Sequence, residues 1–192
     1  MEYKTERLLL RSSTRQDSEV FYNMVQNDKE NFRTYCGAEP TEKNLLATKK
    51  YLGRTNDINC TFSIFLKDSP DTMIGYVGIY LRSGSYELDC YIDKNYRNKG
   101  YCTEASMLVC EKFFNGELIF TNSSDESYTA VFERINAEII ADNAASKKML
   151  SKLGFKKAQD IGFAMFMSME SDDEYYACQT VKYCLGKKTF MR

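Results

Sequence analysis

Residues 91–114 have the sequence Tyr91-Ile-Asp-Lys-Asn-Tyr-Arg-Asn-Lys-Gly-Tyr-Cys-Thr-Glu-Ala-Ser-Met-Leu-Val-Cys-Glu-Lys-Phe-Phe114, and the rest of the chain is organised around them. This pattern predicts a strand end, a short basic loop, and a helix that begins at Thr103. A helix N-terminus exposes unpaired backbone N–H groups and a partial positive charge. Because Gly100 also lets the backbone approach a ligand closely, the loop suits a bound phosphate. The alternative is a solvated turn that is merely basic.

The composition is that of an ordinary folded protein. Of 192 residues, 43% are hydrophobic and 28% charged, which fits a single domain over residues 1–192. The net charge of −1, with both signs interspersed, argues against a nucleic-acid partner. No apolar stretch is long enough to span a membrane or to form a signal-peptide core. We therefore expect a cytoplasmic monomer or homodimer that binds neither nucleic acid nor membrane.

Cysteine and histidine usage narrows the chemistry. The seven cysteines are odd in number and include no C-x-x-C pair, so neither a disulfide framework nor a metal site is predicted. The absence of histidine excludes Ser-His-Asp and Cys-His catalysis and every His-ligated metal. Acid–base chemistry must therefore use carboxylates, Lys, Tyr, Cys or ordered water.

Hydrophobic patterning predicts alternating strands and capped helices. Strands are expected at Glu6–Arg11, Cys60–Leu66, Met73–Arg82, Tyr86–Asp93, Arg134–Ile140, Phe163–Met169 and Ala177–Leu185. Helices are expected after a capping box at Thr14-x-x-Asp17, from Thr41 to Gly53, from Thr103 to Phe114, and from Asn143 to a Schellman ending at Gly154 and Phe155. Residues 27–40 are expected to be irregular, residues 115–132 to form an extended connection with at most one helical turn, and residues 171–174 to form an acidic loop.

Three segments of the chain resemble one known family. They are Glu6-Arg-Leu-Leu-Leu-Arg11, Tyr96-Arg-Asn-Lys-Gly-Tyr-Cys-Thr-Glu-Ala105 and Asn143-Ala-Ala-Ser-Lys-Lys-Met-Leu-Ser-Lys-Leu-Gly-Phe155. Together, and in this order, they resemble the GNAT acetyltransferase superfamily, in particular its RimJ/RimL-like branch of ribosomal-protein N-acetyltransferases. The resemblance implies an α+β (α/β) GNAT fold, with a mixed, mostly antiparallel sheet of six to seven strands flanked by about four helices.

The resemblance also implies acetyl-CoA as donor and a primary amine as acceptor. In the family, an Arg-x-x-Gly-x-Gly/Ala loop wraps the CoA pyrophosphate with backbone amides, and here it maps onto Arg97, Asn98, Lys99, Gly100, Tyr101, Cys102 and Thr103. Cys102 stands where the family has Gly or Ala, but it is small and the contact is through backbone. The preceding strand would hold the pantetheine arm, and two later positions match family residues at the cofactor: the expected contacts are Cys90, Tyr91, Ile92, Asn143 and Ser146.

Each of these positions has a simpler explanation. The alternative for Arg97 and Lys99 is a plain surface charge, and for Asn143 an ordinary helix N-cap, which Asn favours. For Arg97 and Lys99, the match of three motifs favours contact with the cofactor. Cys102 is not expected to be a nucleophile, because the chain has no histidine to activate it.

Direct transfer requires a base, because a lysine-type amine with a pKa near ~10.4 is protonated at neutral pH. Glu138 is the first candidate, since it lies five residues before Asn143, where some peptide N-acetyltransferases of the superfamily carry their base. Glu87 is the second candidate, and Asp89 the third. Each is also compatible with a solvated carboxylate on the polar face of a strand.

A general acid is not assigned. Many GNAT enzymes place a Tyr seven residues after the Asn, and here that position is Leu150. Backbone donors, Ser146 or water would have to stabilise the thiolate. The expected function is an acetyl-CoA-dependent N-acetyltransferase acting on a protein N-terminus or on a small amine such as a polyamine or aminoglycoside. The alternative is a non-catalytic acyl-CoA-binding or protein-interaction module, favoured by the missing Tyr and the long 115–132 connection.

Overall fold

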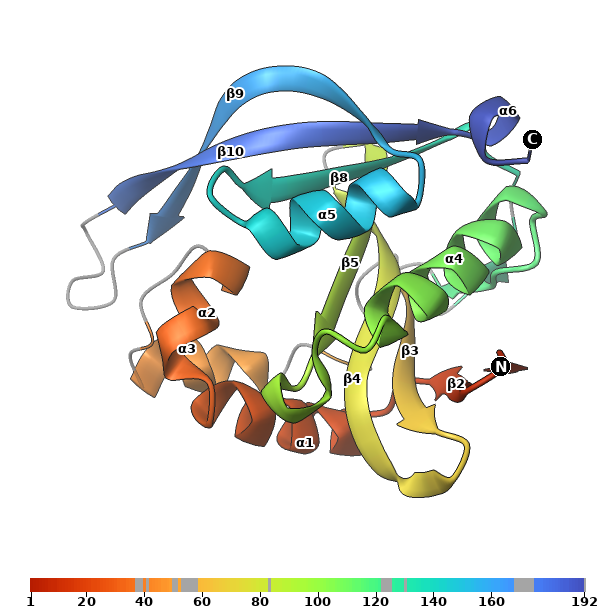
Figure 1. The fold of residues 1–192 in the computed structure, drawn as a ribbon, viewed down its shortest axis with the longest axis horizontal. Helices are drawn as coiled ribbons and strands as arrows, with labels where there is room; N and C mark the ends of the chain where they lie inside the picture. The colour runs from red at the N-terminus through yellow and green to blue at the C-terminus, as the bar shows by residue number, and fades with distance from the viewer. Residues whose placement is uncertain are drawn as a thin grey trace.

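The computed structural model describes residues 1–36, 40, 42–49, 52, 59–82, 84–121, 126–129, 131–167 and 175–191. Their strands form one sheet with helices on both faces (Figure 1). The strands are β1 Glu2–Lys4, β2 Leu8–Ser12, β3 Asn59–Leu66, β4 Ser69–Arg82, β5 Ser85–Ile92, β6 Phe120–Thr121, β7 Ser127–Tyr128, β8 Arg134–Ile140, β9 Lys156–Met167 and β10 Tyr175–Gly186. Their order is β1-β2-β3-β4-β5-β8-β10-β9, with β6 pairing β3 and β7. Only β5 and β8 pair in parallel within the described residues, so the sheet is mixed and mostly antiparallel, as predicted.

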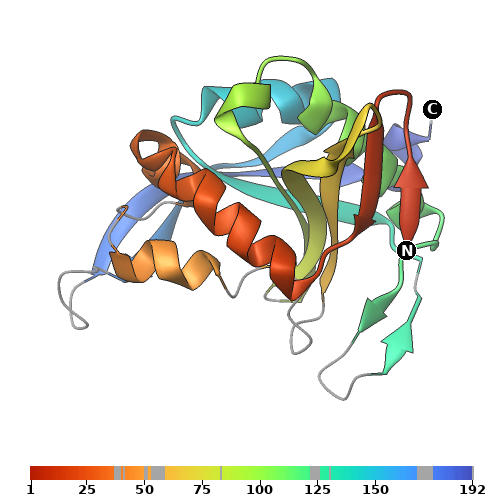
Figure 2. The ribbon, with the colours of Figure 1, turned by 90° about the horizontal axis from the view of Figure 1, so that it is seen from below.

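Two groups of helices cover the opposite faces of the sheet. The helices are α1 Arg15–Gln26, α2 Lys29–Cys36, α3 Glu42–Thr48, α4 Tyr101–Phe114, α5 Ala144–Lys152 and α6 Lys187–Phe190, with a 3-10 turn η1 at Lys94–Tyr96. In Figure 1, α4 and α5 lie in front of the sheet and α1 passes behind β4; Figure 2 shows α1 from its own side. Successive side chains of a strand point to opposite faces of the sheet, so each face has its own apolar cluster. On β5, Tyr91 packs in the cluster that contains Phe21 of α1, and Ile92 packs in the cluster that contains Val109 of α4.

Helix-capping patterns in the sequence predicted two helix boundaries correctly. At the start of α1, the Asp17 carboxylate accepts from the backbone N–H of Thr14 at 2.7 Å, as in a capping box. At the end of α5, Phe155 N donates to the Leu150 carbonyl at 3.0 Å and Gly154 has φ +88°. This is the predicted Schellman motif, and it leads the chain directly into β9.

Other predictions need correction. The described residues contain ten strands rather than six to seven, because β1, β6 and β7 are two or three residues long and too short for an alternating pattern. Part of the supposedly irregular segment 27–40 is helix α2. Residues 115–132 contain the short antiparallel pair β6–β7, and no helix lies in the described part of this segment. The predicted cap at Thr41, the helix end at Gly53 and the acidic loop 171–174 lie outside the described residues.

The sheet splits between β5 and β8. Along its other edge, β5 pairs with β4 from Ser85 to Ile92. Its described pairing with β8 is a single register position, Glu87 opposite Asn136. Past this position the two strands diverge (Figure 1), and α5 follows β8 on the front face of the sheet. The split opens beside the C-terminal end of β5, which leads into η1 and α4.

Candidate functional site

Two pockets occupy the split in the sheet and touch each other. The first has a volume of about 320 Å³ and runs from β5 along the loop before α4 to α5. The second, about 580 Å³, lies between β4, β5, β8 and β10. Six residues line both pockets: Thr34, Tyr35, Cys90, Asn143, Ser146 and Met149. A molecule bound in the first pocket can therefore meet one bound in the second.

The first pocket contains eleven of the twelve predicted cofactor residues. They are Cys90, Tyr91, Ile92, Arg97, Asn98, Gly100, Tyr101, Cys102, Thr103, Asn143 and Ser146. Gly100 is the N-cap of α4 with φ +84°, and Asn98 has φ +63°. These left-handed conformations curl the loop over the helix N-terminus, where unpaired N–H groups and the helix dipole favour an anion. The geometry fits a ligand that carries phosphate.

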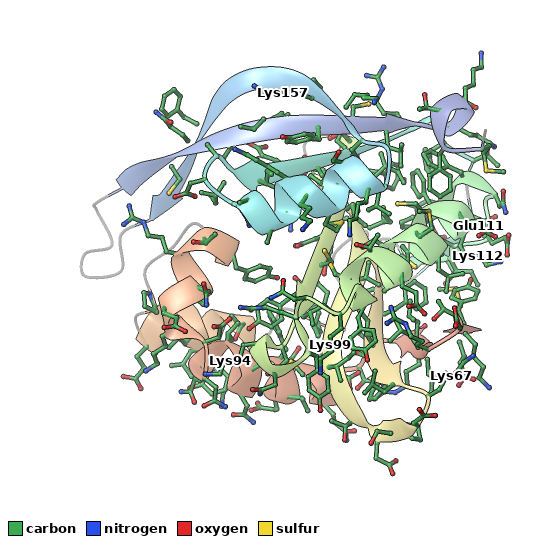
Figure 3. All side chains as sticks on the ribbon, viewed as in Figure 1. Lys67, Lys94, Lys99, Glu111, Lys112 and Lys157 are labelled. Atoms are coloured by element: carbon green, nitrogen blue, oxygen red, sulfur yellow. The ribbon has the colours of Figure 1, made fainter. Side chains whose placement is uncertain are left out.

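Lys99 is the predicted loop residue that does not line this pocket. Its side chain is exposed, with Nζ 5.5 Å from the centre of the Tyr96 ring (Figure 3). Lys148 and Lys152 of α5 line the pocket instead. Sequence reasoning missed both, although their four-residue spacing places them on one helix face.

Arg97 has a structural partner that sequence reasoning did not identify. Its guanidinium pairs with Asp28, whose side chain is 2% exposed, and its Nε donates to the Ile92 carbonyl at 2.9 Å. The Tyr91 hydroxyl donates to the same carboxylate at 3.2 Å. Burial and the Asp28 charge raise the pKa of Tyr91. The ion pair ties the loop to the turn between α1 and α2, so the Arg97 side chain anchors the loop.

A second ion pair holds the start of α4 in place. Arg7 Nη2 lies 2.6 Å from Glu104 Oε2, and Arg7 Nη1 donates to the Lys99 carbonyl at 3.0 Å. The guanidinium carbon of Arg7 lies 4.6 Å from the centre of the Tyr101 ring. Burial acts to raise the pKa of Glu104, but hydrogen bonds from Thr5 and Arg7 outweigh it and hold that pKa below its usual value. The positive charge of Arg7 thus compensates the negative charge of Glu104, which would otherwise repel an anion at the helix N-terminus.

The thiols of Cys90 and Cys102 meet in the wall of the first pocket. Their sulfur atoms are 2.9 Å apart. The hydrogen bond with Cys102 and burial raise the pKa of the Cys90 thiol. A thiol of raised pKa is a poor nucleophile at neutral pH, so Cys90 is not suited to attack a substrate.

Asn143 caps α5 and also contacts another helix. Its Oδ1 accepts from Ser146 N at 2.9 Å, so the simple N-cap explanation holds. Its Nδ2 donates to the Thr34 carbonyl of α2 at 3.2 Å. The residue therefore joins the two helices that border the junction of the pockets.

The second pocket brings the three candidate carboxylates together. Glu87 and Asp89 reach it from β5, and Glu138 from β8. Arg82 Nη1 lies 3.6 Å from Glu87 and its Nη2 3.3 Å from Asp89. Lys182 Nζ of β10 lies 3.3 Å from Glu138. Sequence reasoning missed these two cations: Arg82 reaches Glu87 and Asp89 from the neighbouring strand β4, and Lys182 of β10 is far from Glu138 along the chain.

Glu87 and Glu138 differ in their surroundings. Glu87 is 9% exposed, and burial raises its pKa. Arg82 acts in the opposite direction, and the like charge of Glu138 adds to the rise. Glu138 is less buried and accepts a hydrogen bond from the Thr180 hydroxyl at 2.5 Å. A carboxylate with a raised pKa takes up a proton more readily near neutral pH, which makes Glu87 at least as suitable a base as Glu138.

Leu150 is 1% exposed and belongs to the apolar core. Among the residues that the structure describes, no group of three or more Cys, Asp or Glu side chains is placed to hold a metal ion. Within the same residues, no helix is both long and apolar enough to cross a membrane.

Comparison with known proteins gives consistent matches over most of the chain. Residues 7–156 match the sequence model described as the acetyltransferase (GNAT) domain. The uncharacterized N-acetyltransferase YnaD of Bacillus subtilis (strain 168) is 25% identical over 179 residues, covering 92% of this chain and 95% of that protein.

Solved structures show the same fold. A GNAT-family acetyltransferase from Bacillus anthracis superposes with a TM-score of 0.66 at 20% identity, over 98% of this chain and 99% of that one. RimL, described as a ribosomal L7/L12 alpha-N-protein acetyltransferase in complex with coenzyme A, superposes with a TM-score of 0.64 at 12% identity, over 97% and 98%.

Proposed function

Because this chain belongs to the GNAT acetyltransferase family, and is thereby an N-acetyltransferase that uses acetyl-CoA, we propose that it transfers the acetyl group to a primary amine by direct attack on the thioester. The observation that carries the proposal is the meeting of two pockets in the split sheet. One pocket suits the donor and the other contains the carboxylates needed to activate an amine. Direct attack requires both substrates to be bound together, and this arrangement permits it.

The donor binds in the first pocket. Backbone N–H groups from the loop at residues 97–103 and the N-terminus of α4 receive the pyrophosphate, with Lys148 and Lys152 adding positive charge. Cys90, Tyr91 and Ile92 at the free edge of β5 hold the pantetheine arm through their backbone. In this proposal all predicted cofactor residues contact the donor except Lys99, which does not line the pocket.

The acceptor amine binds in the second pocket. Glu87 or Glu138 takes a proton from the amine, directly or through water, as the nitrogen attacks the carbonyl carbon. The C–S bond then breaks and the thiolate leaves. The raised pKa of Glu87 favours it as the base, with Glu138 the second candidate.

The charges of the second pocket bear on the acceptor. Three carboxylates surround the site, but Arg82 and Lys182 pair with them. A pocket with both signs suits an amine next to a peptide backbone better than a polycation such as a polyamine. An α-amino group, with a pKa of about 8, also requires less help from a base than a lysine-type amine. RimL acts on the alpha-amino group of a ribosomal protein and has the same fold, which supports a protein N-terminus as acceptor.

The experiment is thiol release from acetyl-CoA with a panel of N-terminal peptides, polyamines and aminoglycosides. Turnover with peptides that is abolished by blocking their α-amino group supports the proposal. Turnover only with polyamines or aminoglycosides reassigns the acceptor to a small amine. If CoA raises the melting temperature but no acceptor is acetylated, the proposed transfer to these amines is wrong, and the chain is a member of the family that binds CoA without acting on them.

A further inference from the structure

In the proposed transfer the thiolate leaves where the two pockets meet, so its proton donor is sought among the six residues that line both pockets. Of these six residues, Met149 has no proton to give, and the Asn143 amide is committed to the Thr34 carbonyl. Cys90 shares its thiol with Cys102. The other three residues, Thr34, Tyr35 and Ser146, carry hydroxyl groups.

Acidity separates these three hydroxyls. A phenol has a pKa of about 10, close to that of an alkyl thiol, which is about 8.5 to 9. An aliphatic hydroxyl is far weaker, in the range of bulk water at about 15.7. Serine and threonine can donate a hydrogen bond to a thiolate, but only the phenol can transfer its proton at little cost. Tyr35 supplies the phenol among these three side chains.

The surroundings of Tyr35 hold its ring in a fixed orientation. The ring packs edge-on against Tyr91 of β5, with ring centres 4.8 Å apart, and against Phe21 of α1 at 6.2 Å. Its hydroxyl is hydrogen-bonded to the hydroxyl of Tyr76, which is fully buried. The neighbouring Thr34 carbonyl is bound by Asn143. The phenol is therefore held from three sides at the point where donor and acceptor meet.

Resting on the proposed acetyl transfer, we propose that Tyr35 is the general acid. The amine nitrogen forms its bond to the carbonyl carbon, and its proton goes to Glu87 or Glu138. The C–S bond breaks, and the sulfur takes the proton of the Tyr35 hydroxyl. The Tyr76 hydroxyl donates to the resulting phenolate, and the proton on the carboxyl group returns through water to restore Tyr35.

The same arrangement accounts for the apolar residue at Leu150. That side chain is buried in the core on the α5 side of the site, so α5 supplies no phenol. Tyr35 approaches from α2, on the other side of the junction. The proposed acid is a phenol, as in GNAT enzymes that have Tyr at the position of Leu150, but it comes from α2 instead of α5.

Steady-state kinetics of Tyr35→Phe test the proposal, because the change removes one oxygen and keeps the ring. We expect kcat to fall at least 30-fold, the KM for acetyl-CoA to change less than threefold, and the decline in rate at alkaline pH to disappear. Tyr22→Phe, on the outer part of α1 and outside both pockets, is the matched control and keeps wild-type kinetics. A Tyr35→Phe enzyme with wild-type kcat, or with lowered kcat but an intact alkaline decline, overturns the assignment.

A binding measurement separates this inference from the proposed function. Calorimetry compares CoA with desulfo-CoA, which lacks the sulfur. We expect Tyr35→Phe to weaken CoA binding at least threefold and to leave desulfo-CoA binding unchanged, whether or not an acceptor is known. Equal effects on both ligands, or none, overturn the role of Tyr35. Failure of the wild-type protein to acetylate any acceptor, with the CoA difference intact, overturns only the proposed acetyl transfer.

Discussion

Asn143 Nδ2 donates to the Thr34 carbonyl at 3.2 Å, and this bond joins the start of α5 to the end of α2. The same side chain caps α5 through Oδ1. One amide thus performs two tasks with its two ends.

Two substitutions at Asn143 separate these tasks. Asn143→Ala removes both bonds and should lower the free energy of unfolding by about 2 kcal/mol, about 1 for the cap and about 1 for the second hydrogen bond. Asn143→Asp keeps the capping oxygen but replaces the donor to the Thr34 carbonyl by a second acceptor, so it should lower the free energy of unfolding by about 1 kcal/mol while kcat falls. Urea unfolding and thiol-release kinetics measure the two quantities. An Asp variant as unstable as the Ala variant contradicts the separation.

Arg97 and Lys99 lie two residues apart in the loop, but only substitution of Arg97 should lower stability. Arg97→Gln leaves Asp28 buried without its cation, and we expect a loss of about 3 kcal/mol in unfolding free energy. Lys99→Gln changes an exposed side chain and should leave stability within about 0.5 kcal/mol. Thermal melts of the two variants check this. Equal melting temperatures would show that the Arg97–Asp28 pair contributes little.

Gly100 and Gly84 provide a matched pair for testing the loop. Both have positive φ, +84° and +76°, so alanine at either position should cost about 1 kcal/mol in backbone strain. Only Gly100 lines the first pocket. We expect CoA to raise the melting temperature of Gly84→Ala as it does for wild type, and to do so less for Gly100→Ala. Gly100→Trp should abolish the effect. Undiminished stabilisation of the Trp variant by CoA would exclude the loop as the pyrophosphate site.

The raised pKa of Glu87 has a defined effect on stability. The folded protein holds this proton more tightly than the unfolded chain, so ionised Glu87 lowers stability above its ordinary pKa of about 4.3 and has no such effect below it. Glu87→Gln should therefore match wild type in melting temperature at pH 4 and exceed it at pH 7. Glu111→Gln, exposed on α4 and outside both pockets, is the control (Figure 3). A Glu87→Gln variant less stable than wild type at pH 7 refutes this sign.

The same two carboxylates can be tested as bases. Glu87→Gln and Glu138→Gln should each be made, and the variant that lacks the base should lose activity mainly at lower pH, where the acceptor amine is protonated. At high pH the amine needs no base, and the rates should converge. Wild-type rates across the pH range in both variants would show that neither is the base.

Local patterns allowed most of the fold to be predicted from the sequence. The capping box at Asp17 and the Schellman motif at Gly154 involve residues within a few positions of each other, so their spacing alone is diagnostic. Strand β8 was predicted at its observed bounds because its apolar residues alternate. Helix α2 was missed because its eight residues are mostly polar and follow α1 after two residues.

The candidate site was predicted most fully where it is continuous in sequence. Residues 90–103 form one run, so the loop could be matched as a motif. The Arg97–Asp28 pair spans 69 positions, and Tyr35 meets Tyr76 across 41. Such contacts depend on how the helices pack on the sheet, and no spacing rule in one sequence reveals them.

The split between β5 and β8 also bears on how this protein can change during evolution. On the donor side, residues 90–103 form a single short stretch that one strand and one helix hold in place. On the acceptor side, the lining residues come from four strands, β4, β5, β8 and β10, and from the helices α1, α2, α3 and α5, at positions between 21 and 182. Substitutions that change which amine the protein accepts can therefore accumulate one at a time on separate elements without disturbing the loop. Descendants of such a chain are free to exchange acceptors while they inherit the donor unchanged.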